Sequence, residues 1–151
     1  MAKAFPLQVL LDHSRHRMEA AERLLRMLRR REDAARARLE ELHGFKLDYQ
    51  NKLAGTGAKG VDILLLRDFH AFLAKLDDAI RRQSDEVDKL HGHWQDAHMN
   101  WLALRQKVKA YETLAQRHHT QELARQEKFE QRQSDESALR KHIAQSGKSG
   151  P

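Results

Sequence analysis

Two series of apolar residues at heptad spacing, separated by one glycine-rich segment, dominate this chain of 151 residues. Eleven of fourteen positions are apolar in the first series, and fourteen of fifteen in the second. An apolar repeat of 3.5 residues sustained over this length is typical of a left-handed coiled coil. The first series is Leu7, Leu11, Ser14, Met18, Ala21, Leu25, Leu28, Glu32, Ala35, Leu39, Leu42, Lys46, Tyr49 and Leu53. The second is Leu66, Phe69, Leu73, Leu76, Ile80, Gln83, Val87, Leu90, Trp94, Ala97, Trp101, Leu104, Val108, Tyr111 and Ala115.

The segment Gly55–Gly60 between the two series predicts a turn that folds the second helix back along the first. The two series match in length, and a turn centred on Gly57 and Ala58 places Leu7 near Val108. We therefore predict an all-α fold: a long two-helix antiparallel coiled-coil hairpin with an overhanging C-terminal helix.

The expected boundaries follow from proline, glycine and the end of the apolar repeat. Pro6 suits a first helical turn, and Asp62 places negative charge at the start of the second helix. Past Ala115 only three of eight heptad positions are apolar, so residues 116–145 should overhang as a polar helix. The predicted organisation is one coiled coil over residues 6–145, with a helix at 6–53, a turn at 54–61, a helix at 62–145 and a disordered tail at 146–151.

The composition argues against an enzyme and against a membrane span. Charged residues make up 33% of the chain, cysteine is absent, and no apolar run approaches the ~18 residues that a membrane span needs. The N-terminus does not resemble a signal peptide, so we expect an intracellular, cytoplasmic protein. A two-helix rod offers no concave interior for a small-molecule substrate.

Ten histidines invite a metal hypothesis, which their spacing does not support. His13 and His16 lie three residues apart, but no His-Glu-x-x-His motif occurs and no cysteine is available. The segment 147–149, Gly-Lys-Ser, lacks the earlier glycine of a phosphate-binding loop. We expect neither a metal nor another cofactor.

Arginines form a basic collar midway along the first helix. One interpretation is a solvated helix face whose arginine stems cover the apolar seam. The other is a docking surface for an acidic partner or for nucleic acid. The members of the basic collar are Arg23, Arg26, Arg29, Arg30, Arg31, Arg36 and Arg38.

Polar residues within the seam and aromatic residues beside it carry further information. Glu32, Lys46 and Gln83 interrupt the apolar series, as polar residues that set the register of a coiled coil do. The predicted turn places Glu32 opposite Gln83, where the two could satisfy each other. It also places Phe45 opposite Phe72, where the two rings either widen the seam or form an exposed protein-binding patch.

Several stretches of the chain resemble the flagellar FliJ family over about residues 5–143. The positions outside the seam, Phe45, Phe72 and Ala79, are the more specific part of the likeness. The stretches that carry the resemblance are Phe5-Pro6-Leu7-Gln8-x-Leu10-Leu11, Met18-Glu19-x-Ala21, Leu42-x-x-Phe45-x-x-x-Tyr49-x-x-x-Leu53 and Phe69-x-x-Phe72-Leu73-x-x-Leu76-x-x-Ala79-Ile80.

The resemblance implies a non-catalytic stalk in the flagellar type III export apparatus. Its implied partners are the hexameric export ATPase, which it would enter and activate, a membrane protein of the export gate, and export chaperones. Implied gate-contacting residues are Leu42, Phe45, Tyr49, Phe72, Leu76 and Ala79, with Arg38 and Gln83 at the edges. Implied ATPase-facing residues, at the open end of the hairpin, are Leu10, Arg15, Arg117, Leu123 and Phe129.

The resemblance also implies a monomeric hairpin located in the cytoplasm, at the inner face of the cell membrane beside the flagellar base. Three alternatives stay open at this point: the equivalent stalk of a virulence injector, a basic arm that binds nucleic acid, and a scaffold that pairs with itself. Steeply salt-dependent binding to a duplex would favour the second.

Overall fold

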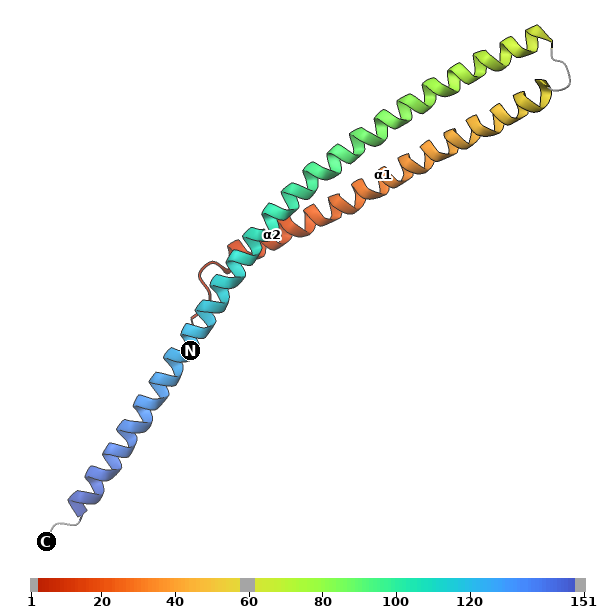
Figure 1. Cartoon of the computed structure of the whole chain (residues 1–151). Helices are drawn as coiled ribbons and strands as arrows, with labels where there is room; N and C mark the ends of the chain where they lie inside the picture. Colours follow the sequence, from red (N-terminus) through yellow and green to blue (C-terminus); the bar gives the residue numbers. More distant parts are fainter. Residues whose placement is uncertain (1–2, 58–61, 149–151) are drawn as a thin grey trace. The chain divides into compact units, whose positions relative to one another are not determined.

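The computed structural model describes residues 3–57 and 62–148, and the fold within them is all-α (Figure 1). Helix α1 covers Gln8–Gly57 and helix α2 covers Ile63–Lys148, with 50 and 86 residues respectively. No strand occurs in either described range. The predicted fold class, two long helices in contact, is confirmed.

The helix ends near the break differ from the sequence-based bounds. Helix α1 begins two residues after Pro6 and continues four residues past Leu53, through Gly55. A glycine inside a helix costs only about 1 kcal/mol relative to alanine, so α1 can continue through Gly55 from the turns before it. Asp62 precedes the first turn of α2 and caps it, because its Oδ1 accepts a hydrogen bond from the backbone N–H of Leu64 at 3.3 Å. The predicted turn residues 58–61 lie outside the described ranges.

The C-terminal end of α2 also corrects the prediction. Ser146 to Lys148, expected in a disordered tail, belong to α2, while residues 149–151 lie outside the described ranges. The exposed stretch begins later than residue 116, because His118 and Glu122 are half-buried. The N-terminal segment covers them: Phe5 packs against the ring of His118, and the backbone N–H of Lys3 donates to Glu122 at 3.2 Å. All residues at 127–147 are exposed.

The described residues divide into two compact units. The hairpin unit comprises residues 19–57 and 62–102, and the terminal unit comprises residues 3–18 and 103–148. Within the hairpin unit Trp101 donates to Glu22 and Lys46 pairs with Asp77, so the helices run antiparallel. Within the terminal unit Arg15 pairs with Glu112 and the Lys3 N–H donates to Glu122, so here too the two segments run antiparallel.

The residues of the two heptad series form the buried seam between α1 and α2 within each unit. Every position of the first series is buried or half-buried, and so is every position of the second except Leu66, which is 38% exposed. Leu66 lies in the first turn of α2. Each fully buried leucine or valine contributes about 1.5–3 kcal/mol. The buried apolar positions are Leu11, Ala21, Leu28, Ala35, Leu42, Leu76, Val87, Leu104 and Val108.

The register of the hairpin unit differs from the predicted one. Glu32 contacts His91 instead of lying opposite Gln83, and Gln83 donates instead to the backbone carbonyl of Ala35 at 3.0 Å. The contacts of the described residues do not test whether Phe45 faces Phe72, so this stays a prediction; Tyr49, which lies one turn after Phe45, packs against Phe72 at 4.3 Å. The longer α1 moves the point of folding back further along the chain than the sequence indicated.

Candidate protein-binding surfaces

The aromatic patch near the break consists of Phe45, Tyr49, Phe69 and Phe72. Tyr49 is half-buried and holds two rings, that of Phe72 at 4.3 Å and that of Phe69 at 4.9 Å between centroids. Phe72 is 45% exposed and Phe45 is 54% exposed, so neither ring is core. Phe45 and Phe72 therefore present aromatic surface to solvent, and the ring of Phe72 is held in place by Tyr49.

The other residues predicted for this surface occupy three different environments. Leu42 and Leu76 are both buried in the seam, each at 8% exposure. Ala79 is half-buried, as is Gln83, whose amide is held by Ala35. Arg38 is exposed and pairs with Glu41 on its own helix at 3.0 Å.

Sequence reasoning missed further apolar surface beside the aromatic patch. Four successive residues at 63–66 open α2, and all are exposed, from Ile63 at 80% to Leu66 at 38%. Four successive positions point to all sides of a helix, so no single seam could have covered them. This run of four apolar residues was the signal available in the sequence. Leu47, on α1, is also exposed, at 58%.

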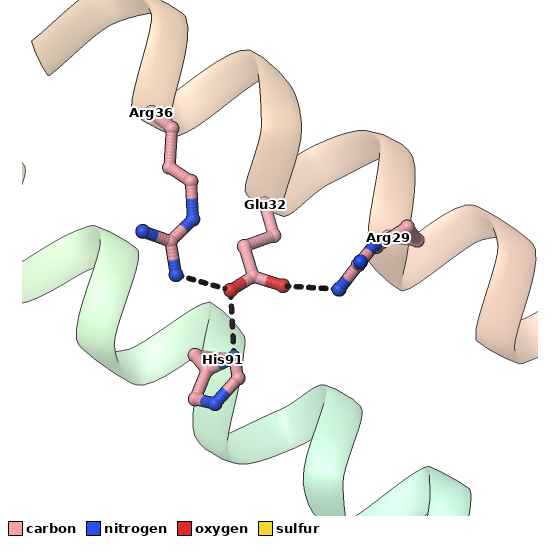
Figure 2. A network of polar contacts seen from close by, with 4 residues as sticks. All are labelled: Arg29, Glu32, Arg36 and His91. Atoms are coloured by element: carbon pink, nitrogen blue, oxygen red, sulfur yellow. Dashed lines mark hydrogen bonds and ion pairs between the residues drawn. The ribbon is translucent and has the colours of Figure 1, made fainter. Parts of the chain in front are cut away.

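A second cluster, the Glu32 network, lies inside the seam of the hairpin unit (Figure 2). Glu32 is only 1% exposed, and its Oε1 accepts hydrogen bonds from Arg36 at 2.8 Å and from Nδ1 of His91 at 2.7 Å. Arg29 lies 3.8 Å from Oε2, an atom that has no hydrogen-bond partner among the described residues. The hydrogen bond from Arg36, reinforced by His91, lowers the pKa of Glu32 although burial opposes the shift.

An aromatic column continues from the Glu32 network along α2. The rings of His91, Trp94, His98 and Trp101 stack in order, at centroid distances of 6.1, 4.9 and 5.7 Å. Arg29 of α1 lies over Trp94 at 5.3 Å, a cation–π contact. Trp94 and Trp101 are thus packing residues of the seam, as the sequence indicated. They also contact the flank of α1, Trp94 through Arg29 and Trp101 through Glu22.

The terminal unit contains the residues predicted to face an ATPase ring. Arg15 pairs with Glu112 at 3.4 Å. Leu10 is 46% exposed and Leu123 is 47% exposed, while Phe129 is 61% exposed on the stretch of α2 beyond Glu122. Arg117 is exposed as well. The set therefore spans an α1–α2 contact region and the first turns of exposed helix.

Glu122 ties the N-terminal segment to α2. It accepts hydrogen bonds from the Lys3 backbone N–H at 3.2 Å and from Arg125 at 2.9 Å, with His118 4.0 Å away. The Lys3 N–H is the main cause that lowers the pKa of Glu122, and the charges of Arg125 and His118 act in the same direction. This arrangement holds the segment before α1 against the side of α2.

The basic collar is exposed throughout its length. Arg29 and Arg36 form ion pairs with Glu32, and Arg38 forms one with Glu41. Part of the basic collar is therefore engaged within the hairpin unit. Residues 23–31 hold five arginines and no acidic residue, which leaves a positive surface on this part of α1.

The described residues contain neither a metal-binding cluster nor a membrane-spanning helix. No group of three or more histidine, cysteine or carboxylate side chains stands close enough to hold a metal ion in that part of the chain. Neither α1 nor α2, over its described length, contains a stretch long and apolar enough to cross a membrane.

Comparisons with known proteins agree with the resemblance seen in the sequence. The family model described as Flagellar FliJ protein matches residues 3–147. The protein named Flagellar FliJ protein from Escherichia coli (strain K12) is 26% identical over 140 residues, which cover 93% of this chain and 95% of that protein. No solved structure matches the chain. The family match extends over nearly all described residues of both units.

Proposed function

This chain belongs to the flagellar FliJ protein family, and we propose that it is a non-catalytic component of the flagellar protein export apparatus. The observation that carries the proposal is the family match over residues 3–147. Within that apparatus the chain acts as a stalk: it inserts into the hexameric export ATPase, activates it, couples it to the membrane export gate and escorts export chaperones.

The aromatic patch is the surface that binds the export gate. Phe45 and Phe72 are about half exposed, and clustered exposed aromatic rings typify protein interfaces more than solvated helix faces. Tyr49 fixes the ring of Phe72, so less side-chain entropy is lost on binding. Leu42 and Leu76 act through packing; the polar edges are Arg38 and Gln83, and Ala79 completes the surface.

The terminal unit engages the ATPase ring. Leu10 and Leu123 are exposed apolar anchors, Arg15 and Arg117 supply charge, and Phe129 extends the surface along α2. These side chains combine apolar contact with positive charge, which suits insertion between acidic and apolar surfaces of a surrounding ring. The protein then works in the cytoplasm, peripherally associated with the inner face of the cell membrane at the flagellar base.

The test of the stalk role is a titration of the purified chain into its cognate flagellar export ATPase, with ATP hydrolysis and ring assembly as readouts. We expect stimulation that saturates near one chain per six ATPase subunits, because a stalk on the ring axis is shared by the hexamer. No stimulation at any ratio would refute the stalk role and leave the fold unaffected.

The gate surface is tested with the double variant Phe45→Ala and Phe72→Ala. Helicity should stay nearly unchanged because both rings are about half exposed. Affinity for the cytoplasmic part of the gate protein should fall at least about tenfold, as expected for the loss of two interface aromatics. Met99→Ala is the matched control, since Met99 is 69% exposed in the same unit and lies away from the patch. A large loss of helical signal would show instead that the rings are core.

A further inference from the structure

Charged side chains are segregated around α1 between residues 20 and 38. A coiled-coil helix carries rows of side chains that repeat every seven residues. Three adjacent rows on the side of α1 away from the seam form the arginine face, whose nine side chains are all exposed and include no acidic residue. Its members are Arg23, Arg30 and Ala37 in one row, Ala20, Met27 and Ala34 in the next, and Leu24, Arg31 and Arg38 in the third.

The acidic residues of the same stretch lie in other rows of α1. Glu32 is buried in the seam, Glu22 accepts a hydrogen bond from Trp101, and Asp33 lies in the row beyond Arg30. A helix face that is only solvated usually mixes both signs of charge, which pair at spacings of three and four residues. The arginine face instead carries one sign of charge over roughly 27 Å of helix.

Three arginines of this face, Arg23, Arg30 and Arg31, have no carboxylate partner among residues 3–57 and 62–148. They differ in this from the basic-collar arginines that form ion pairs, which are Arg29, Arg36 and Arg38. Arg26 and Arg30, four residues apart on one helix, also repel each other. An anion lying over these side chains would relieve the repulsion, so the three unpaired arginines favour an anionic partner.

Two apolar side chains lie among these arginines. Leu24 and Met27 are each 41% exposed. Ala20 and Ala34 precede and follow Met27 in its row, and their side chains are too small to cover it. The middle row of the arginine face is therefore low and apolar, and arginines stand in the rows on both sides of it.

This combination fits an anionic lipid surface better than other polyanions. Nucleic-acid phosphates would pair with the arginines but would offer Leu24 and Met27 no apolar contact. A protein partner is held by large anchor residues packed at the centre of the contact, where this face has alanine on both sides of Met27. In a lipid surface the headgroup phosphates pair with arginine, and the boundary between headgroups and acyl chains receives apolar side chains.

We propose that the arginine face binds the anionic headgroups of a lipid bilayer, with this part of α1 lying along the membrane surface. The headgroup phosphates accept hydrogen bonds from the unpaired arginines, and the side chains of Leu24 and Met27 enter the boundary below the headgroups. The inference goes beyond the proposed export function, because the ligand is the lipid itself and neither the export ATPase nor the gate protein is required.

The first test is co-sedimentation of the purified full chain with lipid vesicles. One set of vesicles is phosphatidylcholine alone, and the other contains equal parts of phosphatidylcholine and phosphatidylglycerol. We expect binding to the second set only, and we expect it to weaken steeply between about 50 and 300 mM salt, because salt screens surface charges. Absence of binding to the phosphatidylglycerol vesicles at the lower salt concentration would overturn the proposal.

Variants that remove charge locate the contact. Arg23→Gln with Arg30→Gln removes two unpaired arginines and should weaken vesicle binding about 25-fold, since each cation at an anionic surface contributes about fivefold. The matched control is Arg81→Gln with Lys89→Gln, which removes the same charge from exposed positions of α2 in the same unit. This control should weaken binding less than about threefold, because its charges lie outside the contact. Equal losses for the two pairs would refute the arginine face as the binding surface.

A variant of the apolar residues distinguishes lipid from other polyanions. Leu24→Gln with Met27→Gln keeps every charge and should weaken vesicle binding at least about threefold, because the two side chains no longer enter the membrane boundary. An unchanged vesicle affinity would contradict the assignment of lipid as the ligand. Tighter binding to a short DNA duplex or to polyglutamate than to the phosphatidylglycerol vesicles, at the same salt concentration, would also show that the proposal is wrong.

Two features of the design keep the outcomes interpretable. All the replaced side chains are exposed and glutamine is a good helix former, so the helical signal of each variant should match that of the original chain. None of the readouts involves the export ATPase or the gate. Failure of vesicle binding would therefore leave the stalk role standing, and failure of ATPase stimulation would leave the lipid contact standing.

Discussion

Two adjacent leucines at the start of α1 allow a sharp test of which helix face is buried. Leu11 is 2% exposed and Leu10 is 46% exposed, although the two are neighbours in the same turn. Replacing a core leucine by alanine costs about 2–5 kcal/mol, the sum of lost apolar burial and the cavity left behind. The seam is one layer of side chains between two helices, so water can enter the space that Leu11 vacates. The expected cost of Leu11→Ala is therefore near the lower end, about 2–3 kcal/mol.

The assay is thermal and urea unfolding of the full chain followed by circular dichroism. For a chain of this length 1 kcal/mol corresponds to roughly 2–4 °C in melting temperature, so Leu11→Ala should lower it by about 4–12 °C. Leu10→Ala makes the same chemical change at an exposed position and should cost less than about 1 kcal/mol. Equal losses for the two variants would refute the assignment of the buried face, and with it the heptad frame of α1.

Three further outcomes are expected. His91→Ala should cost about 1.5 kcal/mol, the lower range for a hydrogen bond to a charged group, because Arg36 still binds Glu32; His93→Ala, at an exposed neighbour, should cost nothing measurable in the same unfolding assay. Because the pKa of Glu32 is lowered, its ionised form stabilises the folded chain at pH values above the unfolded-state pKa near 4.5. This stabilisation is lost as the pH falls through the folded-state pKa. Between pH 5 and 3 the melting temperature should therefore fall more steeply for the original chain than for Glu32→Leu. Truncation after Gln126 removes exposed helix, so the helical signal should fall in proportion to the residues removed while the melting temperature changes by less than about 2 °C; a larger drop would mean that this stretch supports the terminal unit.

The seam was predictable from sequence because burial follows the heptad period closely. Every position from Leu7 to Leu53 in the first series is buried or half-buried, including the polar Ser14, Glu32 and Lys46. The period states which side of each helix is covered, since a residue must return to the same face every 3.5 positions. The two-helix fold and its buried face therefore follow from spacing alone.

The register was not predictable in the same way. In the observed register Glu32 contacts His91, which flanks the seam and carries no apolar signal, and α1 continues past Leu53. Helix ends are set by small energies: glycine at position 55 weakens the helix by about 1 kcal/mol but does not end it. Phe45 and Phe72 are exposed on α1 and α2, but the two rings that Tyr49 contacts could be identified only from the structure.

Both tryptophans of the chain, Trp94 and Trp101, lie in the aromatic column of the hairpin unit. Tryptophan emission is therefore a built-in optical reporter of one segment, sensitive to the distance between α1 and the stacked rings. Binding at the aromatic patch would change this emission only if it altered the packing of α1 against α2 farther along the hairpin unit. The unlabelled protein can thus distinguish a local docking event from one that rearranges the hairpin unit.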